Sequence, residues 1–132
     1  MNINGFLSIS LIDYPEKISS VIYTSPCNFK CPFCHNTSLI EKNNNTIPEE
    51  FIFQSLYMRK KVIDGVTVTG GEPTLQRDIH IFFKEIKKIG LLIKLDTNGY
   101  MPDVIKSLIK NNLVDYVAMD VKNSPLKYEK TA

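Results

Sequence analysis

The feature that most constrains the fold is the alternation of short strand-like runs with helical patterns. The runs are rich in β-branched and aliphatic residues and lie at 18–24, 66–69, 91–95 and 114–121, which is typical of strands. Strands that alternate with helices in this way build βαβ units with right-handed crossovers and a parallel sheet. A complete eight-unit barrel needs about 250 residues, and this chain has 132. We therefore expect an α/β fold of about four parallel βα units, half of a TIM-type barrel with an open, curved sheet.

Three helices are expected between these strands, because apolar residues recur there at helical spacing. Pro48 and Pro102 stand where the first turn of a helix tolerates proline, and Gly90 is placed to end the second helix. The residues expected on the buried faces are Phe51, Ile52, Leu56 and Tyr57, then Ile79, Phe82, Phe83, Ile86 and Ile89, and last Val104, Ile105, Leu108 and Ile109.

Composition indicates an ordinary single domain and excludes several classes of protein. Hydrophobic residues make up 43% of the chain and charged residues 23%, enough apolar material for one core and too much for a disordered chain. The net charge of +2 does not favour nucleic acid or an anionic membrane as partner. No apolar run approaches the ~18 residues of a membrane span. With no leader-like pattern at the N-terminus, we expect a cytoplasmic protein.

The three cysteines form the first motif with chemical meaning. Cys27, Cys31 and Cys34 fall within eight consecutive residues, directly after the first expected strand. An odd, clustered count argues against a disulfide framework and favours a metal or cluster in a reducing compartment. A structural iron-sulfur cluster takes four cysteines, so three would leave one iron open to a substrate. A zinc site with His35 as fourth ligand is the alternative, which the adjacency of Cys34 and His35 disfavours.

Polar motifs also follow the other three expected strands, at what would be one rim of the sheet, where α/β folds place ligands. In Gly70-Gly71-Glu72-Pro73, the glycines allow backbone to approach a ligand and the carboxylate can face an ammonium or hydroxyl group; alone, the motif is more often a turn. Asp96, Thr97 and Asp120 bring two carboxylates and a hydroxyl to neighbouring strand ends, suited to a cation or a cofactor's ribose. The alternative is that these aspartates cap turns and helices.

Together, the motifs resemble those of the radical S-adenosylmethionine (radical SAM) superfamily. The resemblance rests on Cys27-x-x-x-Cys31-x-x-Cys34, with Phe33 before the last cysteine, and on Gly70-Gly71-Glu72-Pro73 after the next strand. It implies a 4Fe-4S cluster held by the three cysteines, whose fourth iron binds the amino and carboxylate groups of S-adenosylmethionine. It also implies that Gly70, Gly71 and Glu72 hold that cofactor.

Within the superfamily, further motifs resemble the glycyl-radical-enzyme activases, in particular the anaerobic ribonucleoside-triphosphate reductase activating proteins. The motifs are Asp13-Tyr14-Pro15, Cys34-His35-Asn36, Asp96-Thr97-Asn98-Gly99-Tyr100 and Asp120-Val121-Lys122. The resemblance implies an oxidoreductase that reductively cleaves S-adenosylmethionine to a 5′-deoxyadenosyl radical and generates a glycyl radical on a partner enzyme. The implied partners are an anaerobic (class III) ribonucleotide reductase and an electron donor such as flavodoxin or ferredoxin.

The resemblance also extends the expected cofactor site to Asp96, Thr97, Asn98, Asp120 and Lys122. A monovalent cation is expected near Asp96 and Asp120, as in some activases. Lys122 is expected to pair either with the cofactor carboxylate or with Asp120.

The resemblance covers nearly the whole chain, so we expect a single radical SAM domain over residues 1–132, short at its C-terminus compared with most of the family. Two alternatives stay open. One is a radical SAM enzyme that acts on a small molecule or peptide, as the 7-carboxy-7-deazaguanine synthases do. The other is a truncated, non-catalytic metal-binding domain.

Overall fold

The computed structural model describes residues 1–42 and 44–131, so that positions 43 and 132 of the expected domain lie outside the described residues. It has a five-stranded sheet in the order β1-β2-β3-β4-β5. The strands are β1 (Ile3–Ser10), β2 (Ser19–Thr24), β3 (Gly65–Gly70), β4 (Leu92–Thr97) and β5 (Tyr116–Met119). The helices are α1 (Glu49–Arg59), α2 (Ile79–Ile89) and α3 (Pro102–Lys110), with 3-10 turns η1 (Thr37–Leu39), η2 (Pro73–Leu75) and η3 (Pro125–Lys130).

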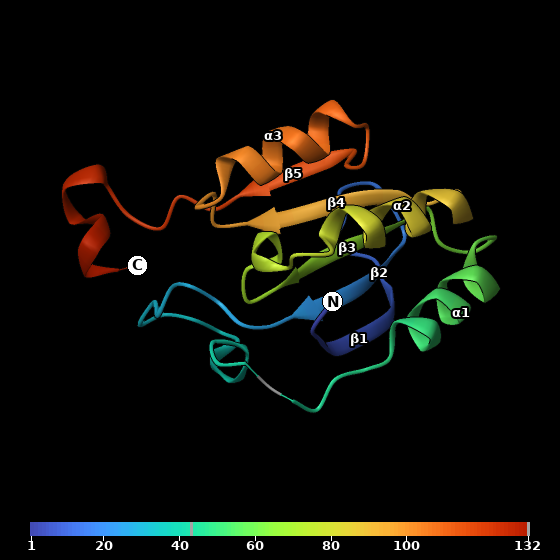
Figure 1. Cartoon of the computed structure of the whole chain (residues 1–132), viewed down its shortest axis with the longest axis horizontal. Coiled ribbons are helices and arrows are strands. Elements are labelled where there is room, and N and C mark those ends of the chain that lie inside the picture. The colour runs from blue at the N-terminus through green and yellow to red at the C-terminus, as the bar shows by residue number, and fades with distance from the viewer. Residues whose placement is uncertain (43, 132) are drawn as a thin grey trace.

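The sheet is mostly parallel and open, which confirms the expected α/β class. Strands β2 to β5 pair in parallel with their neighbours, and β1 pairs antiparallel with β2. The carboxyl ends of the parallel strands therefore meet at one edge of the sheet. Figure 1 shows the loop after β2 and the red C-terminal segment on that same side of the molecule.

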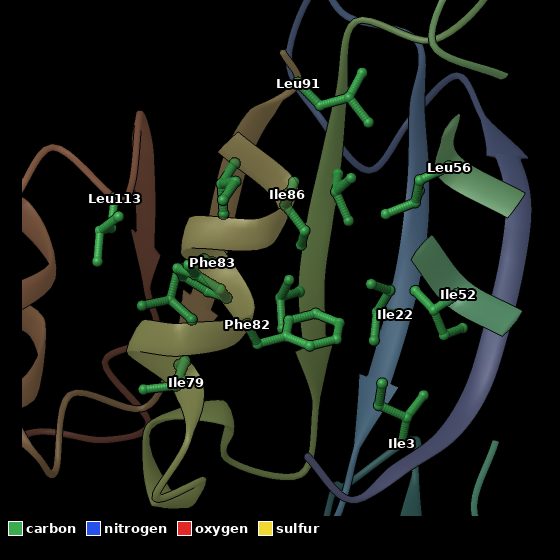
Figure 2. Close-up of a cluster of buried hydrophobic side chains, with 14 of the residues drawn as sticks. Ile3, Ile22, Ile52, Leu56, Ile79, Phe82, Phe83, Ile86, Leu91 and Leu113 are labelled. Carbon is green, nitrogen blue, oxygen red and sulfur yellow. The ribbon is translucent and has the colours of Figure 1, made fainter. Parts of the chain in front are cut away.

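The core lies between the sheet and its helices. Ile22 of β2, Val68 of β3 and Leu95 of β4 are fully buried in one cluster with Phe82 and other residues of α2. In Figure 2, α2 lies against the strands, with Phe82 directed over β3 toward Ile22. Because alternate residues of a strand point to opposite faces, the intervening residues of β2, β3 and β4 are directed to the other face of the sheet.

The predicted buried faces are confirmed for α2 and only partly for the other two helices. On α1, Ile52 and Leu56 are buried, whereas Phe51 and Tyr57 are 53% and 59% exposed. On α3, Leu108 is buried and Ile109 is exposed. The prediction for Phe51, Tyr57 and Ile109 was therefore wrong, because α1 and α3 lie near the edges of the sheet and bury narrower stripes than α2 does.

Strand β1 was not predicted from the sequence. It is an edge strand whose pairing with β2 is interrupted between Ile3 and Gly5 and between Leu7 and Ser10. Only Ile3 among its apolar side chains is fully buried. Such irregular pairing removes the strict alternation of apolar and polar residues by which a strand is recognised.

No helix among the described residues has the length and hydropathy needed to cross a membrane.

Replacing a buried isoleucine of α2 should destabilise the fold much more than the same change on its exposed face. Ile86 is fully buried, whereas Ile81 of the same helix is 66% exposed. We expect Ile86→Ala to lower the free energy of unfolding by about 2–5 kcal/mol, through lost burial and the cavity left behind. Ile81→Ala should change it by no more than about 0.5 kcal/mol. Urea titration of both variants tests this, and equal losses would contradict the assignment of the buried face.

Candidate functional site

A cavity of about 230 Å³ lies at the carboxyl edge of the parallel strands. It brings together residues from loops that are far apart in the sequence, each following a different strand. Of the residues predicted for the site, those that line it are Cys27, Cys31, Cys34, Gly70, Gly71, Asp96, Thr97, Asn98, Asp120 and Lys122. The structure therefore places nearly all of the predicted set around one space, and their individual roles stay predictions.

The three cysteines are free thiols. Cys31 is buried, while Cys27 and Cys34 are half-buried. Backbone hydrogen bonds shape their loop: Cys27 N donates to Ile40 O over 3.0 Å, and Cys34 N donates to Cys31 O over 3.0 Å. Burial raises the pKa of the Cys27 thiol, although the backbone N–H of Phe29 opposes this, so that the unligated thiol keeps its proton to higher pH than an exposed cysteine.

The double glycine lies directly against the backbone that leads into the cysteine loop. Gly71 N donates to Thr24 O over 2.7 Å, and Glu72 N donates to Pro26 O over 3.0 Å. A Cβ at Gly70, where φ is 115°, would lie 2.3 Å from Thr24 N, and one at Gly71 would lie 2.5 Å from Pro26 O. Both positions thus require glycine for packing alone, and the same bare backbone lines the cavity.

Glu72 differs from its expected position. Its side chain is fully buried and is not among the cavity-lining residues. Oε1 accepts hydrogen bonds from Thr74 N and from the hydroxyls of Thr74 and Thr97, and Oε2 accepts one from Asn98 N over 2.7 Å. The predicted contact of Glu72 with a cofactor stays a prediction. The carboxylate has a second task that the sequence did not reveal, which is to join the loop after β3 to the loop after β4.

Three further contacts connect the loops around the cysteines, and sequence reasoning missed all of them. Asn98 Nδ2 donates to Asn28 Oδ1 over 2.9 Å, which joins the loop after β4 to the cysteine loop. Phe29 makes edge-to-face contacts with Tyr100 and Tyr128, with ring centroids 6.0 and 6.2 Å apart. Through Tyr128, η3 is held beside the cysteine loop. No local pattern at Asn28 or Tyr128 signals these contacts, because their partners lie far away in the sequence.

Each aspartate predicted for the site is ion-paired with a lysine. Lys122 Nζ lies 2.6 Å from Asp120 Oδ2, which is one of the two pairings expected for Lys122. Although partial burial lowers the pKa of Lys122, Asp120 raises it through its hydrogen bond and charge, and the nearby thiols of Cys31 and Cys27 add to the net rise. Asp96 is paired with Lys94, which was not predicted as a site residue. A lysine inside the apolar run of a buried strand was the signal that could have revealed it.

The donor set fits an iron-sulfur cluster better than a single metal ion. Among residues 1–42 and 44–131, no three His, Cys, Asp or Glu side chains converge closely enough to hold one ion. A 4Fe-4S cluster takes one thiolate per iron, so its ligands surround a volume and need not converge on a point. Three free thiols around one cavity, beside glycine backbone that leaves room for a ligand, satisfy this requirement.

Comparison with known proteins agrees with these observations. The sequence model of the radical SAM superfamily matches residues 21–130. A protein of Methanocaldococcus jannaschii named as a glycyl-radical enzyme activating enzyme is 43% identical over 96% of this chain and 52% of its own length. A second protein of that organism, with the same kind of name, is 33% identical over 86% of this chain and 42% of its own length. A protein of Saccharolobus solfataricus named as a GTP 3′,8-cyclase is 34% identical over 66% of this chain and 29% of its own length. The chain thus spans about half or less of the length of these relatives.

Replacing Glu72 by glutamine should loosen the site, because the amide NH₂ would face a donor wherever it replaces a carboxylate oxygen. We expect Glu72→Gln to lower the free energy of unfolding by about 1–3 kcal/mol and to speed hydrogen exchange at the Asn98 amide. Glu85→Gln, on the exposed ion pair with Lys88, makes the same chemical change and should cost no more than about 0.5 kcal/mol. Urea titration with amide exchange measures both effects. Unaltered exchange at Asn98 would show that Glu72 does not hold this loop.

Proposed function

This chain belongs to the radical SAM superfamily, and from that premise we propose that it works as a glycyl-radical-enzyme activase. In this proposal it reductively cleaves S-adenosylmethionine and generates a glycyl radical on a partner enzyme, an anaerobic (class III) ribonucleotide reductase. An electron donor such as flavodoxin or ferredoxin supplies the electron. The observation that carries the proposal is the cavity in which three free thiols lie beside the bare backbone of Gly70 and Gly71.

In the proposed holoprotein, Cys27, Cys31 and Cys34 hold a 4Fe-4S cluster, which leaves one iron for S-adenosylmethionine. When bound, the cluster supplies the electron that breaks the sulfonium carbon-sulfur bond. The protein contributes orientation and exclusion of water, as is usual where a cofactor carries the difficult chemistry.

The other cavity residues are suited to hold the polar parts of S-adenosylmethionine. Gly70 and Gly71 offer backbone that a ligand can approach closely, and Thr97 and Asn98 offer a hydroxyl and an amide. The Lys122 ammonium, near the thiols of Cys27 and Cys31, favours negative charge on the sulfur ligands and on a bound carboxylate. The buried Glu72 carboxylate keeps the loop that carries Thr97 and Asn98 in position.

Two observations favour a protein as the substrate. The relatives from M. jannaschii are named as activating enzymes for glycyl-radical enzymes. Residues of three motifs that resemble those of the activases, Cys34-His35-Asn36, Asp96-Thr97-Asn98 and Asp120-Val121-Lys122, also line the cavity. The likeness to a protein named as a GTP 3′,8-cyclase supports the second candidate, a radical SAM enzyme with a small-molecule substrate.

Release of 5′-deoxyadenosine from S-adenosylmethionine tests the proposed chemistry. After anaerobic reconstitution with iron and sulfide, we expect a brown protein that releases 5′-deoxyadenosine when reduced. Cys31→Ala should lose both colour and release, because one iron loses its ligand. His35→Ala should keep the cluster, since the histidine is not a ligand in this proposal. A protein that binds only zinc and stays colourless, or a reduced cluster form that releases no 5′-deoxyadenosine, would contradict the proposal.

A second experiment distinguishes a glycyl-radical enzyme from a small molecule as the substrate. The reduced holoprotein is incubated with S-adenosylmethionine and either an anaerobic ribonucleotide reductase or pyruvate formate-lyase, and the glycyl radical is measured by electron paramagnetic resonance. We expect a glycyl doublet on the ribonucleotide reductase that depends on Cys31. Radical on pyruvate formate-lyase alone would reassign the partner. Radical on neither, with faster turnover of a small molecule, would favour the second candidate.

A further inference from the structure

Lys94 is a buried cation that the proposed reaction has not yet used. It lies within β4, is only 8% exposed, and forms an ion pair with Asp96. Lys94 and Asp96 are two residues apart in one strand, so their side chains share a face of the sheet. That face is opposite the one from which Ile22 and Leu95 point into the core. At the carboxyl end of this face, Asp96 lines the cavity. Lys94 is not itself among the lining residues, but its ammonium is paired with Asp96, which is one of them.

A buried lysine needs a compensating charge. Moving an ammonium group out of water costs several kcal/mol unless it is paired and hydrogen-bonded. Lys94 has Thr67 of β3 and Tyr116 of β5 as its neighbours in the sheet, and neither residue has a carboxylate that could pair with it. Asp96 supplies the anion, through Oδ1. The second carboxylate oxygen can accept a hydrogen bond from a ligand hydroxyl.

The same arrangement occurs at the neighbouring strand end. Lys122 Nζ lies 2.6 Å from Asp120 Oδ2, and both residues line the cavity. The two carboxylates on which the sequence predicted a monovalent cation are thus each neutralised by a side-chain ammonium. A cation added at either carboxylate would meet the positive charge of the lysine already paired with it, and this repulsion weakens its binding.

We propose that the Lys94 and Lys122 ammonium groups serve as the fixed cations of this site, so that Asp96 and Asp120 bind no monovalent metal cation. A covalently attached ammonium needs no dissolved ion and holds Asp96 in one orientation, which makes Lys94 a positioning residue for the cavity. This inference deepens the proposed function, because it concerns how the same site receives S-adenosylmethionine.

Sodium binding to the chain without its cluster tests the inference independently of catalysis. The probe is ²³Na⁺, and the measurement is the broadening of its magnetic resonance line as protein is added in tetramethylammonium buffer. We expect no saturable broadening with the unmodified chain. Lys94→Met leaves the Asp96 carboxylate without its counter-ion and should create a saturable site that K⁺ displaces. Circular dichroism checks that the variant is folded, and Lys94→Arg, which keeps the charge, should behave like the unmodified chain.

The affinity for S-adenosylmethionine gives a second readout in the reconstituted, unreduced protein. For the unmodified chain, replacing K⁺ by tetramethylammonium should change the Kd by less than about twofold. For Lys94→Met, the Kd should rise roughly tenfold without K⁺ and recover when K⁺ is added, as expected when one partner of a desolvated charge pair is removed. Lys87→Met removes a lysine of α2 that is paired over 2.5 Å with Asp115, the residue before β5. Neither residue lines the cavity, so this variant should create no dependence on K⁺.

Two results would overturn the inference. The first is a saturable sodium site in the unmodified chain that Asp96→Asn abolishes, since the lysines would then not occupy the place of a cation. The second is a folded Lys94→Met variant that binds no sodium, since the ammonium would then replace nothing. Failure of the proposed reaction would look different, because it would abolish 5′-deoxyadenosine release and leave the sodium measurement unaffected.

Discussion

The hydrogen bonds of one buried carboxylate hold the site together. Glu72 follows β3 and receives hydrogen bonds from Thr97, the last residue of β4, and from Asn98, which follows it. Its own backbone N–H donates to Pro26, at the start of the cysteine loop. A single residue therefore ties the ends of three parallel strands to one another. Burying the carboxylate without such partners would cost several kcal/mol. Its hydrogen bonds therefore favour the one arrangement of the three loops that also shapes the cavity.

The close approach of two backbones sets the distance between the cysteines and the opposite wall. Gly71 lies against Pro26 so tightly that a methyl group would overlap its carbonyl oxygen. This contact needs the parallel pairing of β2 with β3, which brings Thr24 beside Gly70. The register of the strands therefore fixes how the backbones of the two loops lie at the edge of the sheet, and the thiols lie beside a wall of main chain. Such a wall can follow the shape of a ligand without side chains in the way.

Local patterns in the sequence predicted the parts of this structure that depend on local periodicity. The apolar stripe of α2 was predicted correctly because a helix at the centre of the sheet buries a wide face. Strand β1 was missed because its irregular pairing with β2 leaves no alternating pattern. Phe51 and Tyr57 were misplaced because the edge position of α1 decides which side chains water reaches. The cavity-lining residues were predicted from strand ends and family resemblance. The contact of Asn28 with Asn98 and the donation from Thr97 and Asn98 to Glu72 join residues far apart in the sequence, so no local motif encodes them. Lys94 was missed although its place in a buried apolar strand is a local signal.

In the proposed holoprotein, three thiolates leave one iron free to bind S-adenosylmethionine. Electron-nuclear double resonance on the reduced, reconstituted chain, with S-adenosylmethionine carrying ¹⁵N in its amino group, tests this binding. We expect a hyperfine coupling between that nitrogen and the cluster, as for a nitrogen bound to iron. A cluster signal without such coupling, with all four irons bound by the protein, would show that no iron is free for the cofactor.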